Sequence, residues 1–418
     1  MDGVKLCCAG VALILAAGCR HDPHATGRGV YADIIARDIR IIEKSVGVPF
    51  KREPVLEVTT HEAVRKFLME QVEDSVELRD LAGKEATYKV LGLIPDTMDV
   101  RKLLVDLYTE QIIGLYNPKT KVLYVVDGVP EEVVGPTIMH ELVHALQDQY
   151  IDLDSLLRAP NDDDHLAAAK AVIEGEANFE QMQQTLGDGN FAVRLPGGRE
   201  RLRDLIRDSQ MTPMFSAAPM VIQEEALFSY INGADFVQRF KTREPGKLPF
   251  RDMPQSTEQV MHDGAYFTTP RDAPLRVTLP RVPGSFYENT LGEFDTRLFL
   301  YEHLRDQELA SRAAIGWGGD RYVVVRTPKG NGVAWVAAWD SALDAAEFVD
   351  AFGQAVQSRY HASAPATSAG GVRTYSGRGR TVVLTPREIG GKNAVLIVDV
   401  PAGESTQLLD LSRVTIGG

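Results

Sequence analysis

The sequence is poor in cysteine, histidine and aromatic residues. Its 418 residues include 3 cysteines and 9 histidines, and aromatic residues make up 7%. The cysteines all lie near the start, at Cys7, Cys8 and Cys19, so the rest of the chain can form no internal disulfide bond. The formal net charge of −13 disfavours nucleic acid as a partner. With 44% hydrophobic and 25% charged residues, the composition is typical of a globular protein.

Long apolar runs are also scarce, because the sequence has one near its start and no second stretch that predicts a membrane span. This run is too short to cross a bilayer as a stable helix. It follows Lys5 and leads into Leu-Ala-Ala-Gly-Cys19, which is the plan of a secretory signal peptide and resembles a bacterial lipobox. We therefore expect a signal peptide at residues 1–18, a lipid on Cys19 and a flexible tether at residues 19–29. A plain cleaved signal or a short anchor is the alternative.

This start also predicts where the protein works. A lipid on Cys19 would hold it at a membrane of the bacterial cell envelope, facing the periplasm or the exterior. The next residue is Arg20 rather than aspartate, which by resemblance to Gram-negative sorting rules favours the outer membrane.

Although histidine is scarce, two histidines stand four positions apart in His140-Glu141-Leu-Val-His144. Positions four apart lie on one face of a helix, so both imidazoles can bind one metal ion. Glu141 lies one step round the helix, beside the expected position of a water molecule on that metal. This HExxH arrangement is typical of zinc metallopeptidases, in which zinc activates the water and the glutamate takes its proton. A surface helix with two histidines is the alternative.

The residues around the motif favour a buried helix. Pro136 is typical of the first position of a helix, so we expect this helix to begin there and to continue to about residue 150. Buried histidines and a buried glutamate need polar partners, which a metal ion and its water would supply. Five apolar residues predict the burial: Ile138, Met139, Leu142, Val143 and Leu146.

Catalytic zinc needs a third protein ligand, and the expected helix at residues 166–186 offers two glutamates. We expect Glu174 to be the third ligand. Glu176 is the main alternative, although it is better suited to orient a ligand by a hydrogen bond. Gly175 costs about 1 kcal/mol relative to alanine inside a helix, so we expect a close approach of two helices around the ion. The acidic residues at 163–164 are weaker candidates and more simply cap the helix.

Before the motif, residues 111–126 contain two apolar, β-rich runs on either side of a turn at residues 117–120. This pattern predicts a hairpin. An edge strand beside the metal could hold an extended substrate by main-chain hydrogen bonds, and an ordinary sheet hairpin is the compatible alternative.

The order of helical and strand-like segments predicts the α+β class. We expect one domain at residues 30–285 and a strand-rich α+β region at residues 286–418.

Several of these segments resemble known proteins. The hairpin, residues 140–149 and the Glu-Gly-Glu-Ala sequence at residues 174–177 resemble the gluzincin side of the zincin metallopeptidases, of which thermolysin is the best-known relative. The closer resemblance is to a poorly characterised group of secreted or lipid-anchored bacterial and archaeal proteins related to the peptidase MA-like clan. Residues 228–236, 254–262 and 316–322 are similar to further segments of that group.

The resemblance implies a zincin-like fold, with a small sheet, an active-site helix and a mostly helical lower half, and it implies a peptidase. The zinc ligands would be His140, His144 and Glu174. Glu141 would be the general base, and Glu176 would support a ligand from the second layer.

Many gluzincins add a histidine or tyrosine that donates a hydrogen bond to the transition-state oxyanion. His262 is the candidate here, with Tyr266 and Tyr230 behind it, and a structural histidine in a loop is the alternative. Glu258 is expected either to orient His262 or to cap a helix. The turn at residues 317–322 is expected to be a packing motif.

Three functions follow from these predictions. The leading one is a lipid-anchored zinc metalloendopeptidase that acts on a protein or peptide outside the cytoplasm. The second is a binding or chaperone-like lipoprotein that keeps the scaffold without turnover. The third is a zinc-dependent amidase that acts on cell-wall material.

Overall fold

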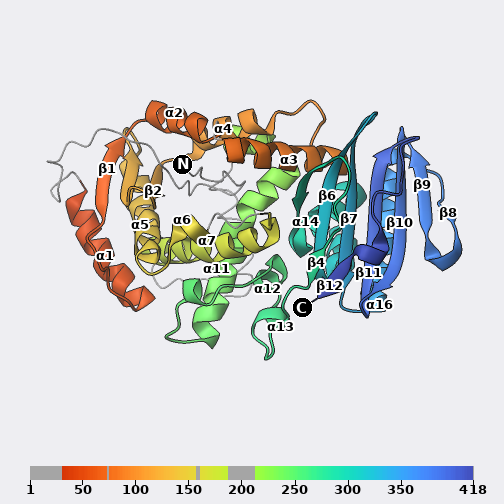
Figure 1. The fold of residues 1–418 in the computed structure, drawn as a ribbon. Helices are drawn as coiled ribbons and strands as arrows, with labels where there is room; N and C mark the ends of the chain where they lie inside the picture. Colours follow the sequence, from red (N-terminus) through yellow and green to blue (C-terminus); the bar gives the residue numbers. More distant parts are fainter. Residues whose placement is uncertain (1–30, 73–74, 157–160, 187–211, 418) are drawn as a thin grey trace.

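The computed structural model describes residues 31–72, 75–156, 161–186 and 212–417 (Figure 1). It has a mixed α+β architecture, which confirms the predicted class. A helical half with a small sheet lies beside a larger sheet formed by the C-terminal part of the chain. The predicted signal peptide, the lipid on Cys19 and the tether lie outside the described residues. None of the helices in the described ranges combines the length and apolar composition needed to cross a bilayer.

The small sheet has three strands in the order β1-β3-β2. β1 (Val55–Thr59) runs parallel to β3 (Val122–Val126), and β2 (Gly114–Asn117) runs antiparallel to β3 as an edge strand. β2 and β3 form the predicted hairpin. Asn117 stabilises its turn, because the side-chain oxygen accepts hydrogen bonds from the backbone N–H groups of Lys119 and Thr120.

Three long helices follow one another away from this sheet: α5 (Glu131–Asp148) packs against β2 and β3, α7 (Asp163–Leu186) packs against α5, and α11 (Met220–Arg243) packs against α7. α5 begins at Glu131, so the prediction that Pro136 opens this helix is wrong. The ring of Pro136 removes the N–H that would bond to the carbonyl of Glu132. Since Glu132 is exposed near the helix start, water can satisfy that carbonyl, and the helix tolerates the proline.

Shorter helices complete the helical half. α1 packs against α5, and α2 packs against α4. Their bounds, with those of the remaining elements of this half, are α1 (Ala32–Val46), α2 (His61–Val72), α3 (Ser75–Leu91), α4 (Val100–Gln111), α6 (Leu153–Leu156), α10 (Pro213–Ala217), η1 (Pro249–Arg251), α12 (Thr257–Met261) and α13 (Asp263–Tyr266).

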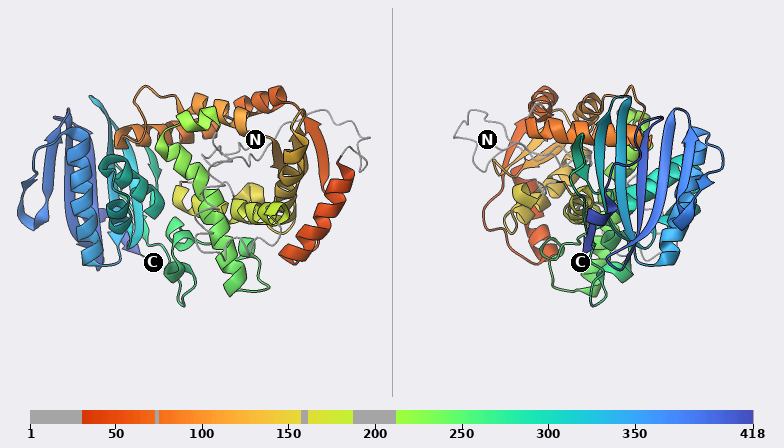
Figure 2. Two further views of the ribbon diagram at one scale, coloured as in Figure 1. Left: turned by 180° about the vertical axis from the view of Figure 1, so that it is seen from behind. Right: turned by 45° about the vertical axis from the view of Figure 1, so that its right-hand side comes forward.

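The large sheet has seven strands in the order β5-β6-β7-β11-β10-β9-β8. One face packs on α16 (Ala342–Tyr360) and neighbouring helices, as seen in Figure 2. A ribbon of β4 (Arg276–Thr278) and β12 (Thr415–Gly417) covers part of the other face. The strands are β5 (Ser285–Asn289), β6 (Trp317–Thr327), β7 (Gly330–Trp339), β8 (Ala366–Thr367), β9 (Arg373–Gly377), β10 (Arg380–Ile389) and β11 (Lys392–Pro401), and the further helices are α14 (Gly292–Leu304), α15 (Gln307–Ala314), η2 (Ala369–Gly371) and η3 (Leu411–Arg413).

Both faces of β7 are buried, which explains its nearly continuous apolar sequence. Trp335 and Trp339 point toward α16, where both rings lie against Phe348. The alternate residues Ala334 and Val336 belong to the core on the other face.

The two halves share a packed interface. α3, from the helical half, packs against β5, β6 and β7, and the Thr87 hydroxyl lies 3.4 Å from that of Tyr322. The larger sheet begins at β5, close to the predicted boundary near residue 285. That boundary stays a prediction, because helices from before it form part of the core that covers the sheet.

Candidate metal centre

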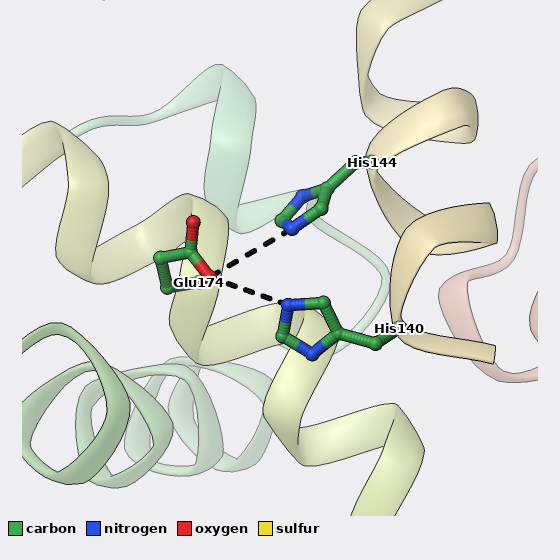
Figure 3. A group of neighbouring side chains, drawn as sticks. All are labelled: His140, His144 and Glu174. Atoms are coloured by element: carbon green, nitrogen blue, oxygen red, sulfur yellow. Dashed lines mark ion pairs between the residues drawn. The ribbon is translucent and has the colours of Figure 1, made fainter. Parts of the chain in front are cut away.

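α5 and α7 bring three potential metal ligands together (Figure 3). His140 and His144 project from one side of α5, and Glu174 faces them from α7. Glu174 Oε2 lies 3.3 Å from His140 Nε2 and 3.7 Å from His144 Nε2. One ligand atom of each residue lies within 4.8 Å of the others, and all three side chains are buried. The structure thus brings together the predicted ligand set.

Glutamine side chains orient both imidazoles. His140 Nδ1 lies 3.2 Å from Gln181 Oε1, and His144 Nδ1 lies 3.1 Å from Gln147 Oε1. An amide oxygen can only accept, so each Nδ1 donates its proton and each Nε2 keeps a free lone pair. Both lone pairs are therefore available to a metal.

Burial makes these histidines poor bases, because it lowers the pKa of each to about 4. They are neutral near pH 7, so their contacts with Glu174 are not ion pairs. Burial raises the pKa of Glu174 to about 7. Lone pairs on three atoms therefore face one another, and a proton or a cation between them would remove the repulsion.

A divalent metal fits this geometry. Among the described residues, no hydrogen-bond partner reaches His140 Nε2, His144 Nε2 or Glu174 Oε2. Each such buried atom ordinarily costs about 1–3 kcal/mol. Nitrogen and oxygen ligands about 2.0–2.2 Å from a tetrahedral zinc lie roughly 3.3–3.6 Å apart, and the distances of 3.3 and 3.7 Å are close to that range. Two imidazoles and a carboxylate are also a ligand set that zinc prefers.

Glu141 lies between the ligand group and the edge strand β2. Its carboxylate accepts a hydrogen bond from the backbone N–H of Tyr116, while Oε2 has no partner among the described residues. Burial, followed by the negative charge of Glu174, raises the pKa of Glu141 well above its usual value. β2 passes close to α5 at Gly114, where a Cβ atom would lie 2.4 Å from Thr137 Cγ2 and 3.4 Å from Glu141 Cγ. The absence of a side chain there lets the strand run beside the general-base candidate.

A second layer of polar residues supports His144. Gln147 Nε2 donates to Glu176 Oε2 over 3.1 Å and to the carbonyl of Ile173 over 3.2 Å. Lys241 of α11 lies 3.5 Å from Glu176 Oε1. Glu176 is thus joined to His144 through Gln147 and faces away from the ligand group, as a residue that orients a ligand would be.

Gly175 marks a close approach of two helices, although the partner differs from the predicted one. A Cβ atom on Gly175 would lie 2.2 Å from the backbone carbon of Gly233 in α11. A Cβ atom on Gly233 would in turn lie 2.1 Å from the carbonyl oxygen of Ala171. The glycine therefore serves the contact between α7 and α11 rather than the contact around the ion.

This crossing brings Tyr230, three residues before Gly233, into the site. Its hydroxyl donates a hydrogen bond to Glu174, and its ring centroid lies 6.3 Å from that of His140. Sequence reasoning placed Tyr230 behind His262. A glycine in the middle of each of two long helices was the signal that could have linked them.

The structure does not bring His262 into contact with this group. His262 lies between α12 and α13, and its Nε2 is 2.8 Å from Glu293 Oε1. Glu293, rather than Glu258, is the carboxylate that orients it. The hydroxyl of the other candidate, Tyr266, donates to the carbonyl of Asp252. Of the three oxyanion candidates, Tyr230 alone contacts the ligand group.

Comparison with known proteins adds one match. Residues 280–410 match a family described as a domain of unknown function (DUF8575). This region covers most of the large sheet and includes none of the residues of the candidate metal centre. No curated protein and no solved structure matches the chain.

Proposed function

We propose that this chain is a zinc-dependent metallopeptidase of the gluzincin type with a zincin-like fold, related to the poorly characterised lipoprotein group that the sequence resembles. One observation carries the proposal: among the described residues, no hydrogen-bond partner reaches the converging buried atoms of His140, His144 and Glu174. The same holds for Oε2 of Glu141, the residue that follows His140 in the motif. An antiparallel edge strand beside the motif helix supports the same fold.

His140, His144 and Glu174 would hold the zinc. When bound, zinc supplies a Lewis acid that polarises a carbonyl and lowers the pKa of water. Glu141 accepts the proton of the attacking water and passes it to the leaving amine. The Tyr230 hydroxyl, which donates to Glu174 in this structure, would instead donate a hydrogen bond to the oxyanion that develops on the substrate. β2, the edge strand beside the motif helix, would bind the main chain of an extended peptide.

The protein would act on proteins or peptides in the bacterial cell envelope, held at the membrane by a lipid on Cys19. Two features support this location. The apolar start ends in a lipobox-like sequence, and the residues after it contain no cysteine, so the folded part needs no disulfide.

Metal analysis of the purified chain tests the proposal. We expect one zinc per chain, lost in Glu174→Ala and kept in Glu176→Gln. The Glu176 variant is the matched control, because it removes a neighbouring buried carboxylate from the same helix. Absence of zinc from the parent chain would contradict the proposal, and zinc without cleavage of any peptide in a broad library would favour a binding protein on the same scaffold.

A further inference from the structure

A second group of acidic side chains converges where the helical half meets the large sheet. Carboxylate oxygens of Glu258, Asp272 and Asp340 lie within 4.8 Å of one another. Glu258 belongs to α12, Asp272 to the segment between α13 and β4, and Asp340 directly follows β7. Three separate segments of the chain therefore contribute to one small volume.

Glu258 has no partner that explains its burial. It is 6% exposed, and no hydrogen-bond donor or basic side chain among the described residues contacts its carboxylate. Glu293 of α14 adds a second such group, because it is 2% exposed and its Oε2 has no hydrogen-bond partner in the described part of the chain. Its negative charge acts on both Glu258 and Asp340.

Nearby positive charge is too small to balance these carboxylates. His262 Nε2 lies 2.8 Å from the other oxygen of Glu293, and the positive charge of Lys392 has only a small effect on Asp340. Burial, followed by repulsion from Glu293 and the neighbouring aspartates, raises the pKa of Glu258 to about 10. A cation between the converging carboxylate oxygens would relieve their mutual repulsion.

We propose that Glu258, Asp272 and Asp340 form a calcium site, with Glu293 as a neighbouring acidic group. Calcium prefers oxygen ligands from carboxylates and accommodates six to eight of them at about 2.3–2.6 Å, so ligand atoms of one ion lie up to about 5 Å apart. Magnesium requires a stricter octahedron and retains several waters, and zinc favours nitrogen or sulfur ligands. Converging carboxylates from separate segments therefore fit calcium best.

The proposed ion would connect the two halves of the molecule. Glu258 and Asp272 lie before the region that matches the family of unknown function, whereas Glu293 and Asp340 lie within it. Calcium at this place would tie α12 to the end of β7 and stabilise the junction. The site shares no residue with the candidate metal centre, so it does not depend on the proposed peptidase function.

Calcium titration of the chelator-treated full chain tests the proposal. Calorimetry should give one calcium per chain, and terbium used as a probe should show luminescence excited through tryptophan, because Trp339 directly precedes Asp340. Both signals should be lost in Glu258→Gln and in Asp340→Asn. They should persist in Glu308→Gln, which changes an exposed carboxylate of α15, and in His144→Ala, which removes a ligand of the other centre.

Thermal unfolding gives a second test. Calcium should reverse the order of the melting temperatures of the parent and Glu258→Gln, whereas it would not do so if Glu258 had only a structural role. Without calcium, Glu258→Gln should melt at the same or a higher temperature than the parent, because it relieves repulsion. With calcium, the parent should become the more stable of the two. Failure of millimolar calcium to bind or to raise the melting temperature of the parent would overturn the proposal, as would equal binding by Glu258→Gln or loss of binding in His144→Ala.

Discussion

Two buried carboxylates, one in each half of the molecule, meet opposite surroundings. Burial raises the pKa of both, that of Glu174 to about 7 and that of Asp320 to about 6. Asp320 accepts four hydrogen bonds of 2.8–3.0 Å, whereas one oxygen of Glu174 faces the lone pairs of two imidazoles. The donors to Asp320 are the backbone N–H groups of Leu291 and Gly292 and the indoles of Trp317 and Trp335.

This difference in hydrogen bonding distinguishes a carboxylate that stabilises the fold from one that can bind a ligand. A carboxylate that is saturated with donors has no capacity left for a ligand, so Asp320 joins β6, β7 and the start of α14. This agrees with the packing role expected for residues 317–322, although these residues form the start of β6 rather than the expected turn. Among the described residues nothing donates to Oε2 of Glu174. Such an unsatisfied oxygen costs stability and is typical of a site that is completed by something it binds.

Replacement of Glu141 by glutamine should have the largest effect. Glu141→Gln keeps the size of the side chain but removes the proton acceptor, so we expect kcat for peptide hydrolysis to fall by about 10²–10⁴-fold with zinc content unchanged. Glu132→Gln, an exposed change on the same helix, is the control and should keep full activity. Full hydrolysis by Glu141→Gln would refute the proposed mechanism.

Removal of the saturated carboxylate should reduce stability instead. Asp320→Ala leaves four buried donors unpaired, so we expect the free energy of unfolding to fall by about 3–5 kcal/mol, as measured by denaturant unfolding. Zinc content of the folded fraction should stay at the parent level. A parallel loss of zinc under native conditions would show that the two carboxylates are not the separate cases that the structure suggests.

The sequence predicted the local parts of this comparison better than the long-range parts. Spacing by four residues identified His140 and His144, and helix periodicity with flanking turns gave the order of most elements. The predicted start of α5 was wrong because proline is most common at the first position of a helix. Here the exposed residue Glu132, one turn earlier, lets water bond to its carbonyl, so Pro136 can lie inside the helix.

Contacts between distant segments could not be predicted in the same way. Tyr230 enters the site because Gly175 and Gly233 let α7 and α11 touch, and no local pattern fixes which helix crosses which. His262 was favoured because the resemblance to gluzincins implies a histidine or tyrosine at the oxyanion, yet its partner Glu293 lies 31 residues further on, outside the candidate metal centre. The four hydrogen bonds to Asp320 likewise depend on donors that the tertiary fold brings together.

The oxyanion candidates provide the next test. Tyr230→Phe removes one hydroxyl donor beside Glu174, so kcat should fall by about 10²-fold while zinc content and KM change little. Tyr266→Phe is a matched loss of a buried hydroxyl outside the centre and should leave kcat unchanged. His262→Ala should also retain kcat. The reverse pattern, with activity lost in His262→Ala and kept in Tyr230→Phe, would restore the prediction made from sequence.

The smallest effect should come from the polar residues that support the candidate ligands by hydrogen bonds, such as Gln147 behind His144. Gln147→Met preserves the length of the side chain but removes the amide oxygen that accepts the hydrogen bond from His144 Nδ1, so the imidazole loses its fixed orientation. We expect zinc affinity, measured by competition with a chelator, to fall by about 10–100-fold. Gln149→Met is the matched control, because Gln149 bonds to the backbone of Lys51 and Arg52 rather than to a ligand. Equal affinities in the two variants would mean that the position of His144 is set by helix packing alone and that the Glu176–Gln147 pair serves stability, as Asp320 does.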